Sequence, residues 1–385
     1  MHVTTESTDL GMVVPSPLGW TPIPTRQRQP WRWGFGVVAV LIAAFLILRI
    51  ITVPYYGILP GEALPVDGPN GAIRLGSVHG GSGDLFLATV ELESPISEWD
   101  RLTDFLHPND DIIPEEDVTG GATASQYNQE NAEAMADSQE DAKVAALRRL
   151  GYKVPELGDG AAIIAVGTGT PAAGVLNAGD VITAIDGKVV TIASEVTTDI
   201  GVLNPGQIVH ITVKRPIPTG FKTISFALQL VACDQLCPGD AGRPLVGIEV
   251  TTDRQSFGLP AGINLSIATN GIGGPSAGLA FTLGTIETLL GHDITGGHLV
   301  AATGTIDPEG TVGDVGGVKQ KTIAVEAQHC QYFIVPRVEY HDAESKAHDL
   351  TIIPVDNLDQ ALTFLASING DLQGVPSVPP PEPAE

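Results

Sequence analysis

Residues 270–278 read Asn-Gly-Ile-Gly-Gly-Pro-Ser-Ala-Gly, and residues 316–321 read Gly-Gly-Val-Lys-Gln-Lys. The first stretch sets Ser276 in a Gly/Pro turn ahead of residues 279–290, which are apolar at helical spacing. Such a turn exposes the hydroxyl, and the start of a helix offers unpaired N–H groups to a developing oxyanion. The second stretch places Lys319 at the opening of another helix, where burial would lower its pKa enough for it to act as a base. Together the two stretches indicate a Ser–Lys hydrolytic dyad.

The second stretch also contains Lys321. Two positions along an α-helix differ by about 200° of rotation, so only one of Lys319 and Lys321 can face the serine. Spacing alone leaves that choice open. The chain has nine histidines, but none lies in a context typical of a base paired to Ser276. We therefore expect lysine rather than histidine as the partner of the serine.

Three stretches resemble the proteolytic domain of the Lon family: residues 274–279, 302–306 and 310–321. The resemblance implies that Ser276 is the nucleophile and Lys319 the general base. It also implies that Thr303 helps to position the lysine, and that Gly273 and Gly274 belong to the turn that holds the oxyanion. The protein is then a serine-type endopeptidase, with an α+β proteolytic domain over residues 241–372.

The chain departs from the ATP-dependent Lon pattern at two positions. Those proteins usually have Asp directly before Gly-Pro-Ser, where this chain has Gly273, and Thr-Gly-Glu in the middle stretch, where this chain has Thr305. No phosphate-binding Gly-x-x-x-x-Gly-Lys-Ser/Thr sequence occurs. In these departures the chain resembles the membrane-anchored Lon-like proteases that carry a PDZ domain. We expect an ATP-independent enzyme with no cofactor and no metal.

The charge composition indicates which classes of molecule the protein can bind. The net charge is −25, and a nucleic-acid phosphate backbone requires clustered Lys and Arg. Nucleic acid is therefore excluded as a partner. Protein or peptide substrates are expected instead, with free C-termini as one route of recognition, and the Lon resemblance allows a homo-oligomer.

An apolar run near the N-terminus predicts a transmembrane helix over residues 34–54. Counted through Val53 the run has about the twenty residues that span a bilayer. Aromatic residues flank it, and basic residues precede it rather than follow it. The prediction is a single-pass cell-membrane anchor, with a disordered cytoplasmic tail (residues 1–33) and the catalytic domain outside the cytoplasm. A cleaved signal peptide is the alternative.

Residues 152–240 resemble a PDZ domain of the bacterial protease type. A strand over residues 161–166 precedes the tight-turn pairs Gly179-Asp180 and Asp186-Gly187. A PDZ domain captures a C-terminal peptide by adding it to a sheet edge, with backbone N–H groups holding the carboxylate.

The loop that binds the peptide is predicted at Leu150, Gly151 and Tyr152, just before the first PDZ strand. The alternative is a PDZ domain that packs on the protease and binds no peptide.

The predicted fold class is α+β: one N-terminal transmembrane helix, a β-rich PDZ-like domain and a Lon-type α+β proteolytic domain. Residues 55–151 are assigned to an extracytoplasmic β/helical linker region and residues 373–385 to a Pro-rich disordered tail. Cys233 and Cys237 close a small disulfide loop or, as the alternative, bind zinc. The alternative function is a catalytically silent PDZ scaffold at the membrane surface.

Overall fold

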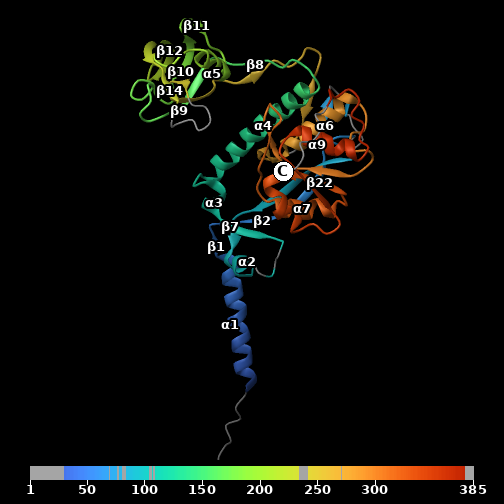
Figure 1. Cartoon of the computed structure of the whole chain (residues 1–385). Helices are drawn as coiled ribbons and strands as arrows, with labels where there is room; N and C mark the ends of the chain where they lie inside the picture. Colours follow the sequence, from blue (N-terminus) through green and yellow to red (C-terminus); the bar gives the residue numbers. More distant parts are fainter. Residues whose placement is uncertain are drawn as a thin grey trace, which may run out of the picture.

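The computed structural model describes residues 30–68, 70–75, 78–79, 84–103, 106, 109–233, 242–269 and 271–377. Two units with separate hydrophobic cores are evident in Figure 1: a larger unit with a central sheet, and a smaller, mostly β unit. The long helix α4 (Ala124–Arg149) runs along the larger unit, and its C-terminal end leads into the smaller one.

The larger unit is built on a six-stranded mixed sheet. Its strand order is β23 (Thr351–Val355), β22 (Tyr332–Pro336), β19 (Val300–Ala302), β5 (Leu85–Glu93), β2 (Tyr55–Pro65) and β7 (Asp111–Pro114). The first four strands are parallel, and β2 and β7 are antiparallel to their neighbours. The first residues of β5 are apolar at every position because this central strand is buried on both faces.

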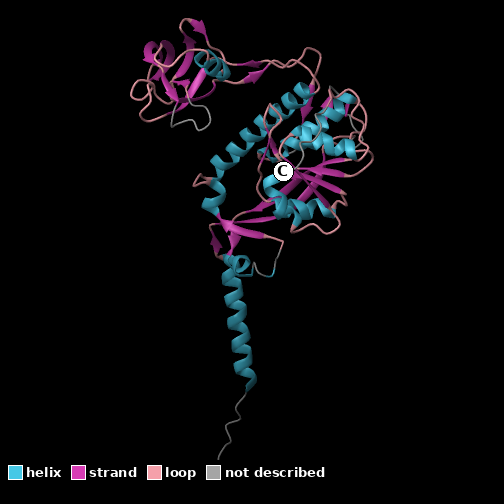
Figure 2. Cartoon of the chain, in the orientation of Figure 1, coloured by secondary structure: helices cyan, strands magenta, loops and turns pink. Residues whose placement is uncertain are grey.

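Helices cover both faces of this sheet (Figure 2). Leu85 and Leu87 of β5 share one core with α4, α6 (Gly278–Leu290) and α9 (Leu358–Ser367). The intervening Phe86 and Ala88 point the other way. They pack against α7 (Val318–Ala327) and α8 (Tyr340–Glu344). The sheet therefore separates two helical layers, and α6 and α7 lie on opposite sides of it.

The region predicted as a linker, residues 55–151, is part of this larger unit. It supplies β2, β5 and β7 to the central sheet, and side chains of β2, β5 and α4 share a core with residues up to Val375. The parallel pairing of β5 with β19 joins segments that are more than two hundred residues apart in the chain. The larger unit is therefore discontinuous in sequence, with the smaller unit inserted after α4.

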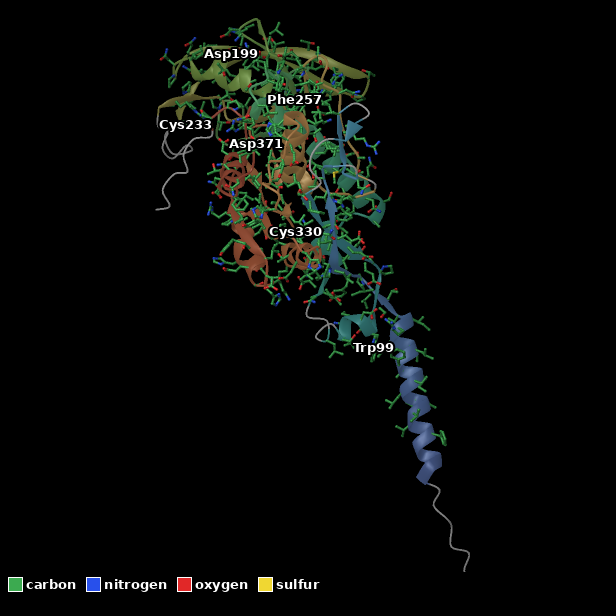
Figure 3. The ribbon with its side chains drawn as sticks, turned by 90° about the vertical axis from the view of Figure 1, so that its right-hand side faces the viewer. Trp99, Asp199, Cys233, Phe257, Cys330 and Asp371 are labelled. Atoms are coloured by element: carbon green, nitrogen blue, oxygen red, sulfur yellow. The ribbon has the colours of Figure 1, made fainter. Side chains whose placement is uncertain are left out.

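The smaller unit is a sheet of order β13 (Gly220–Gln229), β12 (Ile208–Ile217), β10 (Val181–Ile185), β9 (Ala161–Val166) and β16 (Ile248–Thr252), with β11 (Lys188–Val189) paired to β10. Helix α5 (Ala193–Gly201) packs Val196 and Ile200 into its core. Figure 3 shows this unit, marked by Asp199 and Cys233, at the opposite end of the molecule from Trp99.

Short elements complete the fold. They are α2 (Glu98–Thr103), α3 (Glu115–Thr119), η2 (Pro275–Ala277), η3 (Arg337–Glu339), β1 (Thr52–Val53), β3 (Ile73–Leu75), β4 (Val78–His79), β6 (Ile96–Ser97), β8 (Glu156–Leu157), β14 (Val231–Cys233), β15 (Arg243–Leu245), β17 (Ser256–Phe257), β18 (Leu265–Ile267), β20 (Thr305–Ile306) and β21 (Val312–Gly313).

The N-terminal helix α1 spans Pro30–Ile50, and its Phe45 packs edge-on against Trp99 of α2. Its described side chains begin at Phe35, and the apolar run stops at Arg49, which is ion-paired to Asp100 (2.6 Å). Among the helices of the described residues, none combines the length and the apolar character needed to cross a membrane. The prediction of a single transmembrane helix over residues 34–54 is therefore wrong.

The location outside the cytoplasm was inferred from that helix and stays a prediction. Most of the two predicted tails, residues 1–33 and 373–385, lies outside the described residues.

Candidate active site

A cleft of about 1070 Å³ opens between α4 and the strands β2 and β5. Ser276 and Lys321 both line it, together with Gly273, Gly274 and Gly317. Thr303 follows β19 directly, at the carboxyl end of the parallel strands. Ligand sites of parallel sheets lie at that end because the flanking helices and loops leave a crevice there. The cleft therefore draws on both helical layers, with η2 on one side and α7 on the other.

The serine turn has the geometry that the sequence predicts. Gly274 has φ +83°, which L-amino acids with side chains rarely adopt. Pro275 then begins the short helix η2, which continues into α6. The first N–H groups of such a helix have no intrahelical partner. Ser276 is half-buried at this helix start and lines the cleft.

Two hydrogen bonds from α4 hold the turn in place. The Gly274 N–H donates to the main-chain carbonyl of Asn131 (3.1 Å), and the Ser138 hydroxyl donates to the carbonyl of Pro275 (3.0 Å). A Cβ at Gly278 would lie 2.9 Å from Ser138 Oγ, so only glycine fits at the start of α6. The Gly274 N–H, predicted to hold the oxyanion, is thus occupied by α4 in this conformation.

Thr303 connects the serine to a lysine. Its hydroxyl donates to the main-chain carbonyl of Ser276 (3.1 Å) and accepts from the Lys321 ammonium (3.2 Å). A threonine hydroxyl has one proton to donate and lone pairs to accept, so it makes both bonds at once. The predicted positioning threonine therefore contacts a lysine, but that lysine is Lys321.

Lys319, the predicted base, lies elsewhere. Its ammonium is 3.5 Å from Asp342 of α8, and its side chain is 39% exposed, whereas Lys321 is 2% exposed. The structure does not bring Lys319 into the cleft with Ser276. The helical period contained the missing signal. Lys321 is three residues after Val318 and four before Val325, and both valines are buried, so the three side chains share one face of α7.

Burial changes the protonation of Lys321. Removal of the ammonium from water lowers the pKa of Lys321 from 10.5 to about 8, while the negative charge of Glu339 acts in the opposite direction. Within the part of the chain that the structure describes, no carboxylate lies at ion-pair distance from this amine. The pKa of Lys321 is therefore much closer to physiological pH than that of an exposed lysine, as a general base requires.

The predicted peptide-binding residues of the smaller unit are not at its sheet edge. Leu150 packs against the core of the larger unit, and Gly151 lies beside Pro376. They and Tyr152 follow the last turn of α4. The edge of this sheet is formed by β16, which among the described strands pairs with β9 alone. It lies next to α5, since the Ala193 N–H of α5 donates to Thr252 Oγ1 of β16 (3.0 Å).

Neither of the two described cysteines, Cys233 and Cys330, lines the cleft. Cys233 is buried at the end of β14 and is disulfide-bonded, while the predicted partner Cys237 lies outside the described residues. Cys330 is a buried free cysteine, and burial raises the pKa of its thiol to about 12. A thiol of that pKa is a poor nucleophile.

Comparison with known proteins matches each unit to a family. Residues 267–367 match the model of the Lon protease (S16) C-terminal proteolytic domain, and residues 148–230 match that of the PDZ domain. Among curated proteins, the chain is 33% identical over 97 residues to the Lon protease of Chloroflexus aggregans and 32% identical over 95 residues to that of Neorickettsia sennetsu. Each match covers 24% of this chain, but only 12% and 11% of the respective relative.

Solved structures similar to the chain include two PDZ domains of SdrC-like proteins. The domain from Listeria monocytogenes is 34% identical and covers 24% of this chain and 87% of its own, with a TM-score of 0.21. The domain from Listeria innocua is 33% identical and covers 24% and 93%, also with a TM-score of 0.21. The family models indicate that the chain combines a Lon-type proteolytic domain with a PDZ domain, and the Lon matches indicate a peptidase.

Proposed function

We propose that this protein is an ATP-independent serine endopeptidase in which Ser276 is the nucleophile and Lys321 the general base. One observation carries the proposal: a buried lysine, with its pKa lowered to about 8, is joined to the main chain of the serine through a single threonine hydroxyl. Lysine acts as a base only when burial of this kind leaves part of it neutral.

The reaction proceeds by acyl transfer. Neutral Lys321 moves from the Thr303 hydroxyl to the Ser276 hydroxyl, which its flexible four-carbon stem permits, and takes the proton as Ser276 Oγ attacks a peptide carbonyl. The Ser276 N–H, at the start of the helix, stabilises the oxyanion. The protonated lysine then gives its proton to the leaving amine. Lys321 next takes a proton from water, which hydrolyses the acyl-enzyme.

The cleft suits an extended polypeptide. Its volume of about 1070 Å³ exceeds the space that one side chain needs, and it runs between a helix and two strands rather than ending in a closed pocket. A folded protein offers no extended segment to such a cleft, so the proposed substrates are unfolded proteins, peptides or exposed termini.

The PDZ unit is proposed to recruit those substrates or to regulate cleavage. The outer edge of β16, next to α5, is the position at which an extended peptide would add to the sheet. Fluorescence anisotropy with a library of labelled peptides tests this role, with each peptide compared to its C-terminally amidated twin. Equal affinity of the twins would exclude recognition of a free C-terminus.

Cleavage of an unfolded protein substrate, without ATP, tests the proposed enzyme. The full chain is compared with Ser276→Ala, Lys321→Ala and Lys319→Ala. We expect the parent and Lys319→Ala to cleave the substrate, and Ser276→Ala and Lys321→Ala to be inactive. A mass shift on Ser276 after incubation with an activated ester would report the nucleophile independently. If the parent neither cleaves nor acylates, the scaffold function replaces the enzyme.

A further inference from the structure

The strand wall of the cleft carries two carboxylates, Glu62 and Glu91. Glu62 lies in a bulge of β2, where the pairing with β5 shifts between Pro60 and Ala63. Both backbone groups of Glu62 are bonded to the Thr89 hydroxyl at 2.9 Å. Thr89 and Glu91 lie on the same face of β5 because side chains alternate along a strand. The two carboxylates are therefore concentrated in one short part of the wall.

The described residues that line the cleft include no exposed positive charge to balance them. Among the residues that line it, the charged ones are Glu62, Glu91 and the buried Lys321. Both glutamates are exposed, and the described residues provide neither of them with an ion-pair partner. A bound chain would thus meet an anionic wall, on a protein whose net charge is already −25.

The opposite wall is polar but uncharged. Asn128, Asn131 and Gln139 of α4 line the cleft with Met135, at spacings that place them on one helical face. Amide side chains can both donate to and accept from an extended peptide backbone. This wall can hold the main chain of a substrate, whereas the β2–β5 wall can distinguish the charge of its side chains.

We propose that the cleft selects extended segments with a Lys or Arg side chain near the scissile bond and rejects segments with acidic residues there. The inference rests on the proposed peptidase function and adds its substrate class. Selection comes from Glu62 and Glu91, by attraction of a cation and by repulsion of a third carboxylate.

A matched peptide series tests this selection. Fluorogenic peptides of one uncharged sequence receive Lys, Gln or Glu at successive positions around the cleavage site, and kcat/KM is measured for each. At one or more positions we expect the Lys peptide to exceed the Glu peptide by about tenfold in wild type, as exposed charge pairs allow. The ratio should fall as salt is raised from 0.1 M to 1 M, where the Debye length is only about 3 Å.

The variants Glu62→Gln and Glu91→Gln, singly and together, assign the effect. The Lys-to-Glu ratio should fall in each and approach one in the double variant. Glu93→Gln is the matched control, since Glu93 is exposed on the same strand but does not line the cleft; it should keep the wild-type ratio. Equal cleavage of all three peptides by the wild type, or a ratio unchanged in the double variant, would overturn the inference.

Binding separates this inference from the proposed function. Affinities of the same peptides for full-length Ser276→Ala are measured by anisotropy, with and without the two glutamate substitutions. If no peptide is cleaved but Lys peptides bind tighter than Glu peptides only when Glu62 and Glu91 are present, the charge selection stands and the peptidase function fails. If peptides are cleaved by Ser276 without charge preference, the peptidase function stands and the charge selection fails.

Discussion

The two units of this protein each bury a charged side chain, and they treat it differently. In the PDZ unit, Asp180 is fully buried and receives Arg215 through two bonds, Nε–Oδ1 at 2.7 Å and Nη2–Oδ2 at 2.6 Å. Arg215 also lies over the ring of Phe226. In the proteolytic unit, Lys321 is equally buried, but its described hydrogen-bond partner is the neutral hydroxyl of Thr303.

The difference separates a buried charge that stabilises the fold from one that can take part in proton transfer. A buried charge with a bidentate partner keeps its ionised form and holds elements together. A buried amine without a counter-ion has an unstable ionised form, so its pKa falls into the range in which it can exchange protons with a substrate. Loss of the first should affect folding and loss of the second should affect turnover, and each experiment below tests that contrast.

The largest expected effect is on catalysis. Lys321→Met keeps the length and burial of the side chain but removes the base, so kcat should fall by about 10²–10⁴-fold. The fold should persist, because replacement of an uncompensated buried charge by an apolar group is neutral or stabilising. Turnover and circular dichroism of the full chain measure the two effects. Lys319→Met is the control and should retain activity; loss of turnover there instead would reverse the assignment of the base.

The second effect is on the PDZ unit alone. Asp180→Ala removes the acceptor of Arg215 and of the Asn177 N–H, and because Arg215 is itself partly exposed, that unit should lose about 1.5–3 kcal/mol. Hydrogen–deuterium exchange of the full chain should show this loss of stability as faster exchange of the amides in β9, β10 and β12. Lys188→Ala is the control: it breaks an exposed pair with Asp199 (2.6 Å), which solvent screens, and should leave the exchange of these strands unchanged. An Asp180→Ala protein with unchanged exchange would remove the structural half of the contrast.

The third effect is the pH dependence of turnover. In the proposed mechanism the neutral form of Lys321 is the base. Since its pKa is about 8, kcat/KM should fall by about tenfold per pH unit below pH 8. Stability should move in the same direction. The pKa of Lys321 is about 8 in the folded chain and 10.5 as its ordinary value, so the unfolded chain binds more protons between these values and stability rises with pH there.

Glu339 provides the matched variant for this profile. Its charge raises the pKa of Lys321, so Glu339→Gln should shift the acid limb of the kcat/KM profile to lower pH. Glu344→Gln, on the neighbouring α8, should leave the limb in place. A profile that does not respond to Glu339→Gln would mean that the titrating group is not Lys321.

The smallest expected effect concerns the serine turn. Ser138→Ala removes the hydrogen bond to the Pro275 carbonyl, worth about 1 kcal/mol, and should lower kcat several-fold with little change in KM. Ser125→Ala, on an exposed first turn of the same helix, controls for changes in α4. An equal fall in both variants would show that α4 acts through its overall stability rather than through this bond.

Much of the site could be predicted from local sequence. The Gly-Gly-Pro-Ser-Ala-Gly turn and the helix after it follow from glycine and proline chemistry over a few residues, and the structure shows the turn as expected. Thr303 was predicted to position Lys319, and in the structure its hydroxyl contacts Lys321 instead. The prediction of Lys319 was made by alignment, whereas the apolar face of α7, which includes Val318 and Val325, favours Lys321 as the proposed base.

Other features depend on contacts between distant segments. The pairing of β5 with β19 and the packing of α4 against the serine turn join parts of the chain on either side of the PDZ unit. No local pattern around residues 55–151 shows that these strands complete a distant sheet, so they were predicted as a linker. For the same reason, β16 was not predicted as the outer PDZ strand: it follows the other strands and returns to pair with β9.

The sequence by itself determined the chemistry that is available: a serine on a glycine-rich turn, lysines at a helix start and a threonine after a strand, because these depend on backbone preferences over a few residues. The depth to which Lys321 is removed from water depends on tertiary packing. Removal of this amine from water requires β2 and β5 to pack against α7, and that burial lowers the pKa of Lys321.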